Sequence, residues 1–480
     1  MFSLLYGSLN RNFMVQRTYI YEFRARPADR RLLFALQYSS VPRVSSGPLR
    51  EAQRLRHPPL VSILAMCNPD DASAPKTVPR RAALRKVKFG TTDMMVTEVC
   101  GGTMTWGSFN ADESDAHAQL DKLWELGVNF LDTAELYPVA WNYGALTERW
   151  IGNWLAKRVA DGTLKREDIY IATKINPSHI GAEHPERKSG SPHGYDSEIM
   201  HWSAKKSIER MGCGYIDLYQ IHWPSRDVPI MSTPTFAPDG VNRFAKFADR
   251  GTQADFDRTV LSIKELIDEG LIKHWGVSNE NAYGITMLCT TCVRLGCPLP
   301  VSCQNDFSIL NQTYEEDTYE AAYRFGVVGL PYGALCGGTL TGKYFEKTKP
   351  EYAAKDAKDR PLEKCRHRVS SGFQPRYGAK PAMAAAEEVV ALAEEWGVTP
   401  TELSIAWAIQ RKCNASVIIG TTTVRQVEEC VGAALLDLPE PLMKAVDAVH
   451  EKYRNPCMFY ADKQVWKEMG YARAAEDPEA

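Results

Sequence analysis

Short apolar runs alternate with amphipathic stretches from about residue 96 to residue 420, and this alternation restricts the fold more than any other feature of the sequence. The apolar runs predict buried strands, and the amphipathic stretches predict helices. A repeated order of strand, helix and strand is typical of a parallel sheet covered by helices. The predicted strands are 96–101, 128–132, 169–174, 216–221, 273–278, 300–304, 326–331 and 416–420.

The predicted helices occupy the intervals between these strands. Several of them end at a glycine, which readily adopts the left-handed conformation of a helix C-terminus. Two short alternating runs joined by residues 90–93 predict a β-hairpin before the first strand. We therefore expect an α/β fold, a (β/α)8 TIM barrel with an N-terminal β-hairpin. The expected helices are 114–126, 145–160, 197–212, 254–270, 281–296, 316–325 and 401–412.

Three long irregular segments follow a common rule. They lie at 175–196, 223–253 and 341–380, each after a predicted strand and before the next helix. Such segments project from the C-terminal face of the strands, which carries the active site in barrels. We expect these long loops to form lids and substrate walls.

The first part of the chain differs in charge from the rest. Residues 1–66 contain ten arginines, no lysine and three acids, a net charge of +7, whereas the whole chain carries -2. Arginine-rich, acid-poor segments are typical of organellar transit peptides. We expect residues 1–75 to be a basic, disordered transit segment for a chloroplast or mitochondrion, followed by the barrel over 80–455 and a tail over 456–480. There are two alternatives: a basic arm that binds anionic surfaces, or residues included from an upstream start. In either case we expect a cytoplasmic protein.

The remaining composition excludes several classes of protein. With 44% hydrophobic and 24% charged residues, the chain has the profile of a globular protein with a large core, and nothing indicates a nucleic-acid partner. No run of 18 apolar residues predicts a membrane span. Twelve scattered cysteines fit a reducing compartment. Cys289, Cys292, Cys297 and Cys303 have spacings that a metal could use, but the first two lie in an apolar stretch of helical period, so we expect no metal site.

Ionisable residues stand at the ends of three consecutive predicted strands: Asp132, Lys174 and His222. Singly, each has a structural explanation, as a turn cap, a surface lysine or a core histidine. In a barrel, however, the ends of neighbouring strands converge, so the three can meet. Tyr137 follows Asp132 by five residues and can fold back over the same place. A lysine ammonium beside a phenol lowers the pKa of the phenol, and a carboxylate would hold the lysine.

With these residues in place, the sequence resembles the aldo-keto reductases over about residues 86–455. The resemblance rests on Asp132 and Tyr137, on Thr173-Lys174, and on the Asp-Leu-Tyr-Gln-Ile-His-Trp-Pro of residues 217–224. Further motifs are similar to the bacterial Tas-type branch, which is related to the β subunits of voltage-gated potassium channels. The resemblance implies a barrel, NADPH and reduction of a small-molecule carbonyl substrate. The further motifs are residues 101–107, 276–280, 338–344 and 418–423.

The resemblance also implies roles for single residues. Tyr137 would be the general acid, Lys174 its partner, Asp132 the anchor of the lysine, and His222 the donor that orients the carbonyl. Ser278, Asn279 and Gln304 would bind the nicotinamide carboxamide, and Tyr332 would stack on the ring; without the resemblance, these four have ordinary roles in turns and core. Other residues that the resemblance places at the cofactor are Gly102, Thr103, Met104, Leu335, Leu340, Gly342, Lys343, Gly420 and Thr422.

The segment after the last strand predicts a helix start independently of the resemblance. Thr423 is a predicted N-cap with Gln426 three residues later, a capping-box spacing. Free backbone N–H groups at a helix start favour an anion. By resemblance this is the 2′-phosphate site of NADPH, with Gln426 and Glu429 near the adenosine. Two departures from the family pattern are Cys430 in place of an asparagine, and Ser371-Gly-Phe in place of Ser-Arg-Phe, which leaves Arg376 as the substitute cation.

Two other functions stay open on the sequence. The first is a nicotinamide-binding, redox-sensing regulatory subunit with little turnover, against which His222 argues because the resembling channel subunits carry asparagine there. The second is a Schiff-base aldolase that uses Lys174. Trp106, Trp141 and Trp223 near the mouth suggest an apolar or aromatic substrate, although tryptophans that merely pack are an equal explanation.

Overall fold

The structure is a computed structural model that describes residues 76–107, 112–138, 146–176, 195–226, 228, 251–345 and 374–457. Eight parallel strands form one sheet in the order β10-β3-β4-β5-β6-β7-β8-β9. All eight strands predicted from the sequence are present. They are β3 (Val99–Gly102), β4 (Phe130–Asp132), β5 (Tyr170–Ile175), β6 (Ile216–Ile221), β7 (Ile272–Ser278), β8 (Ser302–Gln304), β9 (Val328–Gly329) and β10 (Val417–Gly420).

Backbone hydrogen bonds also join the two outer strands of this order. The Gly329 N–H donates to the Cys413 carbonyl oxygen at 2.8 Å, and the Ala415 N–H donates to the Gly329 oxygen at 2.9 Å. The Ile418 N–H donates to the Pro331 oxygen at 2.9 Å. Because β9 thereby meets the segment that leads into β10, the sheet curls into a barrel, the fold that the sequence predicts.

The predicted hairpin closes the N-terminal end of the barrel. β1 (Lys86–Lys88) pairs antiparallel with β2 (Met95–Thr97). Phe89, in the turn between them, is fully buried, and its ring lies 5.4 Å from the Phe130 ring, centroid to centroid. Side chains of the hairpin and of the barrel interior at this end form one apolar cluster, which also contains Leu218 of β6. This end of the barrel is therefore filled with side chains.

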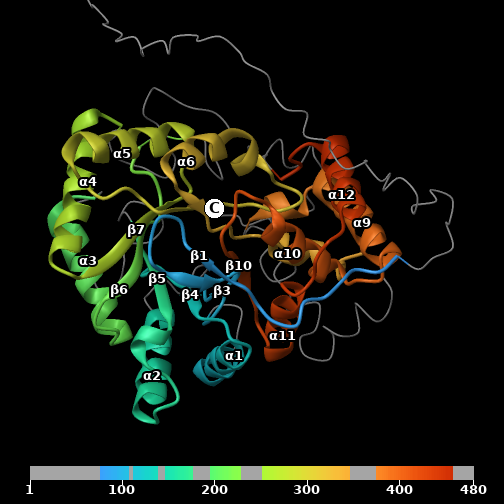
Figure 1. Ribbon diagram of the computed structural model, residues 1–480, viewed down its shortest axis with the longest axis horizontal. Helices are drawn as coiled ribbons and strands as arrows, with labels where there is room; N and C mark the ends of the chain where they lie inside the picture. The colour runs from blue at the N-terminus through green and yellow to red at the C-terminus, as the bar shows by residue number, and fades with distance from the viewer. Residues whose placement is uncertain are drawn as a thin grey trace, which may run out of the picture. The chain divides into compact units, whose positions relative to one another are not determined.

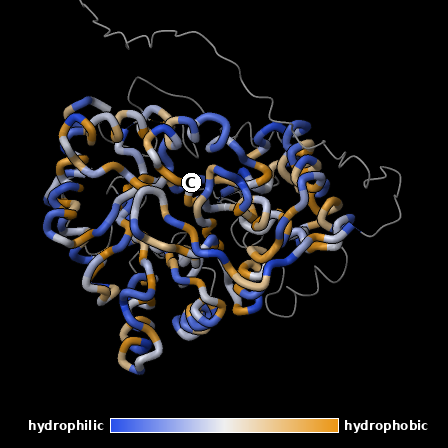
Figure 2. The backbone as a smooth tube through the Cα atoms, in the orientation of Figure 1, coloured by the Kyte–Doolittle hydropathy of each residue, from blue (hydrophilic) through white to orange (hydrophobic). Residues whose placement is uncertain are grey.

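Helices surround the strands, following one another around the barrel in Figure 1. Figure 2 shows hydrophobic and hydrophilic residues alternating along their turns, as expected for helices with one face on the core. Gly212 and Gly296 end two of them with φ of 56° and 64°. The helices are α1 (Glu113–Glu125), α2 (Leu146–Ala160), α3 (Ser197–Met211), α4 (Gln253–Asp268), α5 (Ala282–Leu295), α6 (Tyr319–Phe325), α9 (Lys380–Glu395), α10 (Pro400–Gln410), α11 (Val424–Ala433) and α12 (Glu440–Tyr453).

The structure departs from the predicted helices in two ways. α9 and α12 were not expected. The segment expected as a helix over 316–325 begins as a π-helix, Tyr314–Thr318, before α6. Cys457, which falls in the predicted tail, is fully buried, and its N–H donates to the Leu310 oxygen at 3.4 Å.

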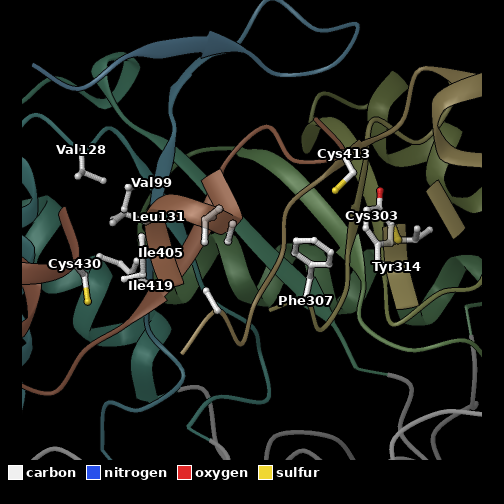
Figure 3. Close-up of a cluster of buried hydrophobic side chains, with 14 of the residues drawn as sticks. Val99, Val128, Leu131, Cys303, Phe307, Tyr314, Ile405, Cys413, Ile419 and Cys430 are labelled. Carbon is white, nitrogen blue, oxygen red and sulfur yellow. The ribbon is translucent and has the colours of Figure 1, made fainter. Parts of the chain in front are cut away.

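A large apolar core lies between the sheet and the helices. Figure 3 shows part of it, with Cys430 of α11 near Ile405 and Ile419 on one side and Phe307 near Tyr314 and Cys303 on the other. Residues 76–85 pack against the last helices: the Asp437 N–H donates to the Pro79 oxygen at 2.9 Å. Within the described ranges, no helix is long and apolar enough to span a membrane.

Candidate active site

Asp132, Tyr137 and Lys174 meet at the C-terminal end of the strands. Asp132 is the last residue of β4, and Lys174 lies in β5, the neighbouring strand. Lys174 Nζ donates to Asp132 Oδ1 at 2.6 Å, to the Thr133 carbonyl oxygen at 2.7 Å and to the Tyr137 hydroxyl at 3.2 Å. Asp132 and Lys174 are 2% and 0% exposed, so the three acceptors replace water around the ammonium.

The electrostatics of this group differ from the sequence prediction in one respect. Burial raises the pKa of the Tyr137 phenol, and the Lys174 ammonium lowers it by less, so the net shift is upward. The prediction of a lowered pKa was therefore wrong for the protein as it stands, because the desolvation of the phenolate outweighs the attraction of the ammonium. A phenol with a raised pKa stays protonated at neutral pH, which is the form that a proton donor needs.

Lys174 itself is held in its charged form. Burial alone would lower the pKa of its ammonium, but the Asp132 carboxylate and Tyr137 raise it above the ordinary value. A nucleophilic lysine must lose its proton. This lysine is protonated, wholly buried and bonded to three acceptors, and these facts argue against the Schiff-base aldolase.

His222 follows β6 directly and faces the same group. Its ring lies edge-on to the Tyr137 ring with centroids 5.8 Å apart, and it stacks on the Trp223 ring at 5.5 Å. Burial, aided by the Lys174 charge, holds the pKa of His222 well below its usual range, so the imidazole is neutral. Its Nδ1 atom is buried and has no hydrogen-bond partner among the described residues. A neutral imidazole with an unused nitrogen can bind a polar group of a ligand.

Asp132 has two further partners, and sequence reasoning missed one of them. Gln304 Nε2 donates to Asp132 Oδ2 at 2.8 Å, and Gln220 Nε2 donates to the same oxygen at 3.1 Å. Gln220 lies in β6 and is fully buried. Its signal in the sequence is a glutamine inside a strand that is otherwise largely apolar.

The residues predicted to bind nicotinamide form a connected cluster beside His222. The Ser278 hydroxyl donates to the main-chain carbonyl oxygen of Gln304 at 2.8 Å, and the Tyr332 hydroxyl donates to Asn279 Oδ1 at 2.7 Å. Asn279 Nδ2 donates to the His222 carbonyl oxygen at 2.9 Å. Asn279 has a φ of 55°, a conformation that asparagine tolerates better than most residues. The cluster therefore fixes the backbone around His222.

The segment after β3 adjoins the same site. The Thr103 N–H and hydroxyl both donate to the Asp132 carbonyl oxygen at 3.1 Å. Gly102 has a structural role of its own, because a Cβ there would lie 2.8 Å from the Ile419 carbonyl oxygen of β10. Met104 is partly exposed, and Trp106 is fully buried in the core. Trp106 is therefore a core residue rather than the predicted pocket wall, Trp223 is partly buried, and Trp141 lies outside the described residues.

The loop after β9 contains four of the residues predicted to bind the cofactor. Leu335 and Lys343 are partly exposed, and Gly342 has a φ of 81° at the end of the 3-10 segment η3 (Cys336–Thr341). Leu340 is fully buried, and its N–H donates to the Leu335 oxygen at 3.2 Å. The Leu340 side chain is part of the apolar core.

Arg376 also lies elsewhere than expected. Its Nε donates to Asp306 Oδ2 at 2.7 Å, and its Nη2 donates to the Tyr377 hydroxyl at 2.7 Å. Burial would lower the pKa of this guanidinium, but Asp306 and Tyr377 raise it well above the ordinary value. With a residue exposure of 1%, Arg376 is held in a buried ion pair and is not placed to receive a 2′-phosphate.

The predicted helix start after β10 is present. Thr423 is the N-cap of α11, and its hydroxyl accepts from the Gln426 N–H at 3.2 Å. The expected capping box is altered, because Gln426 Oε1 accepts from the Thr422 N–H at 2.9 Å. Gly420 is exposed, Glu429 is partly buried, and Cys430 lies in the core. The structure thus contains the predicted helix start, and the cysteine is buried in the core.

The described residues contain no group of three or more His, Cys, Asp or Glu that could hold a metal ion. Cys289 and Cys292 lie buried on α5, and burial raises the pKa of Cys289 to about 12. Thiols in this state are small core residues.

Known proteins are similar to this chain in sequence. Residues 98–451 match the Aldo/keto reductase family. The chain is 32% identical to Protein tas of Escherichia coli over 358 residues, which cover 74% of this chain and 94% of that protein. It is 24% identical over 361 residues to the uncharacterized oxidoreductase YrpG of Bacillus subtilis, with 75% and 94% covered. It is 25% identical over 360 residues to a probable voltage-gated potassium channel subunit beta of Arabidopsis thaliana, with 74% and 93% covered.

Proposed function

Since the chain belongs to the Aldo/keto reductase family, a family of oxidoreductases, we propose that it reduces aldehydes or ketones to alcohols with NADPH and that Tyr137 donates the proton. One observation supports this most directly: Lys174 Nζ contacts both Asp132 Oδ1, at 2.6 Å, and the Tyr137 hydroxyl, at 3.2 Å. A phenol paired with a buried ammonium is suited to general acid catalysis.

The residues of the site fit a nicotinamide cofactor. Tyr332 supplies an aromatic ring, and Ser278, Asn279 and Gln304 supply amide and hydroxyl groups close to His222. The buried Nδ1 of His222 has no partner within the described residues, as expected of an atom that meets a ligand. At the other end, α11 begins next to the exposed Gly420, and its capped N-terminus favours a phosphate.

Each side chain then has a defined task. When NADPH is bound, the hydride for the carbonyl carbon comes from its nicotinamide ring. Tyr137 protonates the developing alkoxide, and the Lys174 ammonium stabilises the phenolate that remains. Asp132 keeps Lys174 charged and in place. The neutral His222 orients the carbonyl by a hydrogen bond.

The alternative is a nicotinamide-binding regulatory subunit with little turnover. The similarity to channel subunits beta favours it to some degree. Two facts support the enzyme instead: His222 is a polar group directed at Tyr137, and the Asp132–Lys174–Tyr137 chain is complete.

The test is a titration of the purified full chain with NADPH, followed by a panel of aliphatic and aromatic aldehydes. We expect saturable binding and many turnovers per chain, measured as loss of NADPH absorbance. Binding without turnover would support the regulatory subunit, and failure to bind NADPH would overturn both proposals.

We also propose that residues 1–75 direct the protein to a chloroplast or mitochondrion, on the strength of their arginine content. A fluorescent reporter fused behind these residues tests this. Import and cleavage are expected, and a reporter that stays in the cytosol would contradict the proposal.

A further inference from the structure

Gln220 is a buried amide in a part of the barrel where an apolar residue would be simpler. It is 0% exposed, and Leu218, two residues earlier on β6, belongs to the apolar cluster that fills the lower barrel. Burying an amide is unfavourable unless its polar atoms are hydrogen-bonded. The bonds of Gln220 should therefore show why a glutamine is placed there.

Both ends of the Gln220 amide are engaged by the site. Its Nε2 donates to Asp132 Oδ2 at 3.1 Å, and its Oε1 accepts from Gln304 Nε2 at 3.1 Å. Gln304 Nε2 also donates to Asp132 Oδ2 at 2.8 Å. The three side chains thus close a triangle of hydrogen bonds, made by β4, β6 and β8.

The chemistry of this triangle fixes how each amide is oriented. An ionised carboxylate only accepts hydrogen bonds, so both glutamines must turn their NH2 ends toward Asp132. Gln304 then uses its two N–H bonds on Asp132 and on Gln220. Only its side-chain oxygen, Oε1, is left for a ligand, and this oxygen is the natural acceptor for the NH2 group of a carboxamide.

We propose that Gln220 is a positioning residue that presents the side-chain oxygen of Gln304, Oε1, to the nicotinamide carboxamide and holds Asp132 against Lys174. The cofactor contact and the proton-donating group are then parts of one network. This inference rests on the function proposed above. Gln220 acts through Asp132 and Gln304, since its side chain is hydrogen-bonded to those two side chains.

The role requires a donor and an acceptor on one short side chain. Methionine has the length of glutamine and neither group. A protonated glutamic acid has both, an O–H for Asp132 and a carbonyl oxygen for Gln304. An ionised glutamate has no donor and repels Asp132. Gln220→Glu should therefore behave like the wild type only while the new carboxyl is protonated, which burial beside Asp132 favours.

The titratable groups around this point come from several elements. Asp132 and Tyr137 come from β4 and its loop, Lys174 from β5, and His222 from the end of β6. Cys100 of β3 interacts with Asp132 and Lys174. β7 contributes Gly276 opposite Gln220. Of these groups, Asp132 is the one that directly faces the new carboxyl of Gln220→Glu.

The test measures the dissociation constant for NADPH by calorimetry, without substrate. The wild type, Gln220→Met and Gln220→Glu are each measured at about pH 6 and about pH 9. The dissociation constant of each variant is compared with that of the wild type at the same pH. Gln220→Met leaves the Gln304 side chain unoriented, so the cofactor loses about one hydrogen bond, and we expect binding about fivefold to tenfold weaker at both pH values. Gln220→Glu should bind like the wild type at the lower pH and at least about tenfold more weakly at the higher pH.

Gln312→Leu is the matched control, because Gln312 is also buried and its Nε2 has no partner in the described ranges. It should bind NADPH as the wild type does. Unchanged binding by Gln220→Met would overturn the inference, and so would Gln220→Glu binding that is equally weak at both pH values, which would indicate packing alone. If Gln220→Met does not fold, Gln220→Glu alone decides by its pH dependence. A wild type that does not bind NADPH would overturn the proposed function instead, so the two failures are distinguishable.

Discussion

Lys174 and Asp132 form an ion pair of 2.6 Å in which the two side chains are 0% and 3% exposed. Removal of one partner leaves the other charge without compensation in the interior, where water cannot solvate it. Stability and chemistry therefore depend on the same contact, and variants can separate the two.

Lys174→Met should lower the free energy of unfolding by about 3 to 5 kcal/mol, because it leaves the Asp132 carboxylate unpaired. Urea unfolding measures this loss. The double variant Asp132→Asn with Lys174→Met removes both charges and should recover most of the stability but none of the activity. A single variant within about 1 kcal/mol of the wild type would show that the pair is not buried as described.

The rate of reduction should stay level through neutral pH and fall only above about pH 10. The reason is that burial raises the pKa of Tyr137 more than Lys174 lowers it, so the acid keeps its proton. The free energy of unfolding depends on pH in the same direction. The pKa values of Tyr137 and Lys174 are both raised in the folded protein, so the stabilisation that these groups contribute is complete below about pH 10. It is lost as the pH rises through the folded pKa values. Profiles of kcat/KM and of urea unfolding check this. A decline in kcat/KM between pH 7 and pH 9 that is caused by ionisation of Tyr137 would contradict it.

Arg376→Met should destabilise the protein by about 3 kcal/mol and leave the preference for NADPH over NADH unchanged. The guanidinium is paired with Asp306 at 2.7 Å, and the two side chains are 2% and 11% exposed. Adding Asp306→Asn should restore part of the stability. A tenfold loss of preference for NADPH in a variant of normal stability would instead make Arg376 a phosphate ligand.

The segment before the hairpin should stabilise the barrel without affecting the site. Arg81 and Arg85 each lie 2.8 Å from the buried Glu98 carboxylate. Replacing both arginines with methionine should lower the free energy of unfolding by about 2 kcal/mol, a value reduced for the exposure of Arg85. The dissociation constant for NADPH should not change. Glu98→Gln added to this variant is the control and should recover the loss; if it does not, the arginines stabilise the barrel by packing.

Much of the barrel could be predicted because the alternation of strands and helices is local. Each strand is an apolar run, and the ends of α3 and α5 are set by glycine. α9 and α12 were not predicted, although their buried residues recur with the period of a helix. The number of helices between two strands is a property of the fold and not of a local pattern.

The site was predictable where strand order decides it. Asp132, Lys174 and His222 meet because β4, β5 and β6 are neighbours. Burial was not predictable in the same way, because it depends on residues distant in sequence. Arg376 pairs with Asp306, 70 positions away, and Trp106 lies wholly in the core. The raised pKa of Tyr137 likewise follows from burial of the phenol, which cannot be predicted from the sequence alone.

The central claim is that Tyr137 is the proton donor, and Tyr137→Phe tests it most directly. The phenyl ring keeps the shape of the site and removes only the hydroxyl that Lys174 contacts. With NADPH binding and unfolding measured alongside, we predict that kcat for an aldehyde accepted by the wild type falls by about 10² to 10⁴-fold while the dissociation constant for NADPH changes little. A Tyr137→Phe protein that reduces the same aldehyde at the wild-type rate would contradict the account.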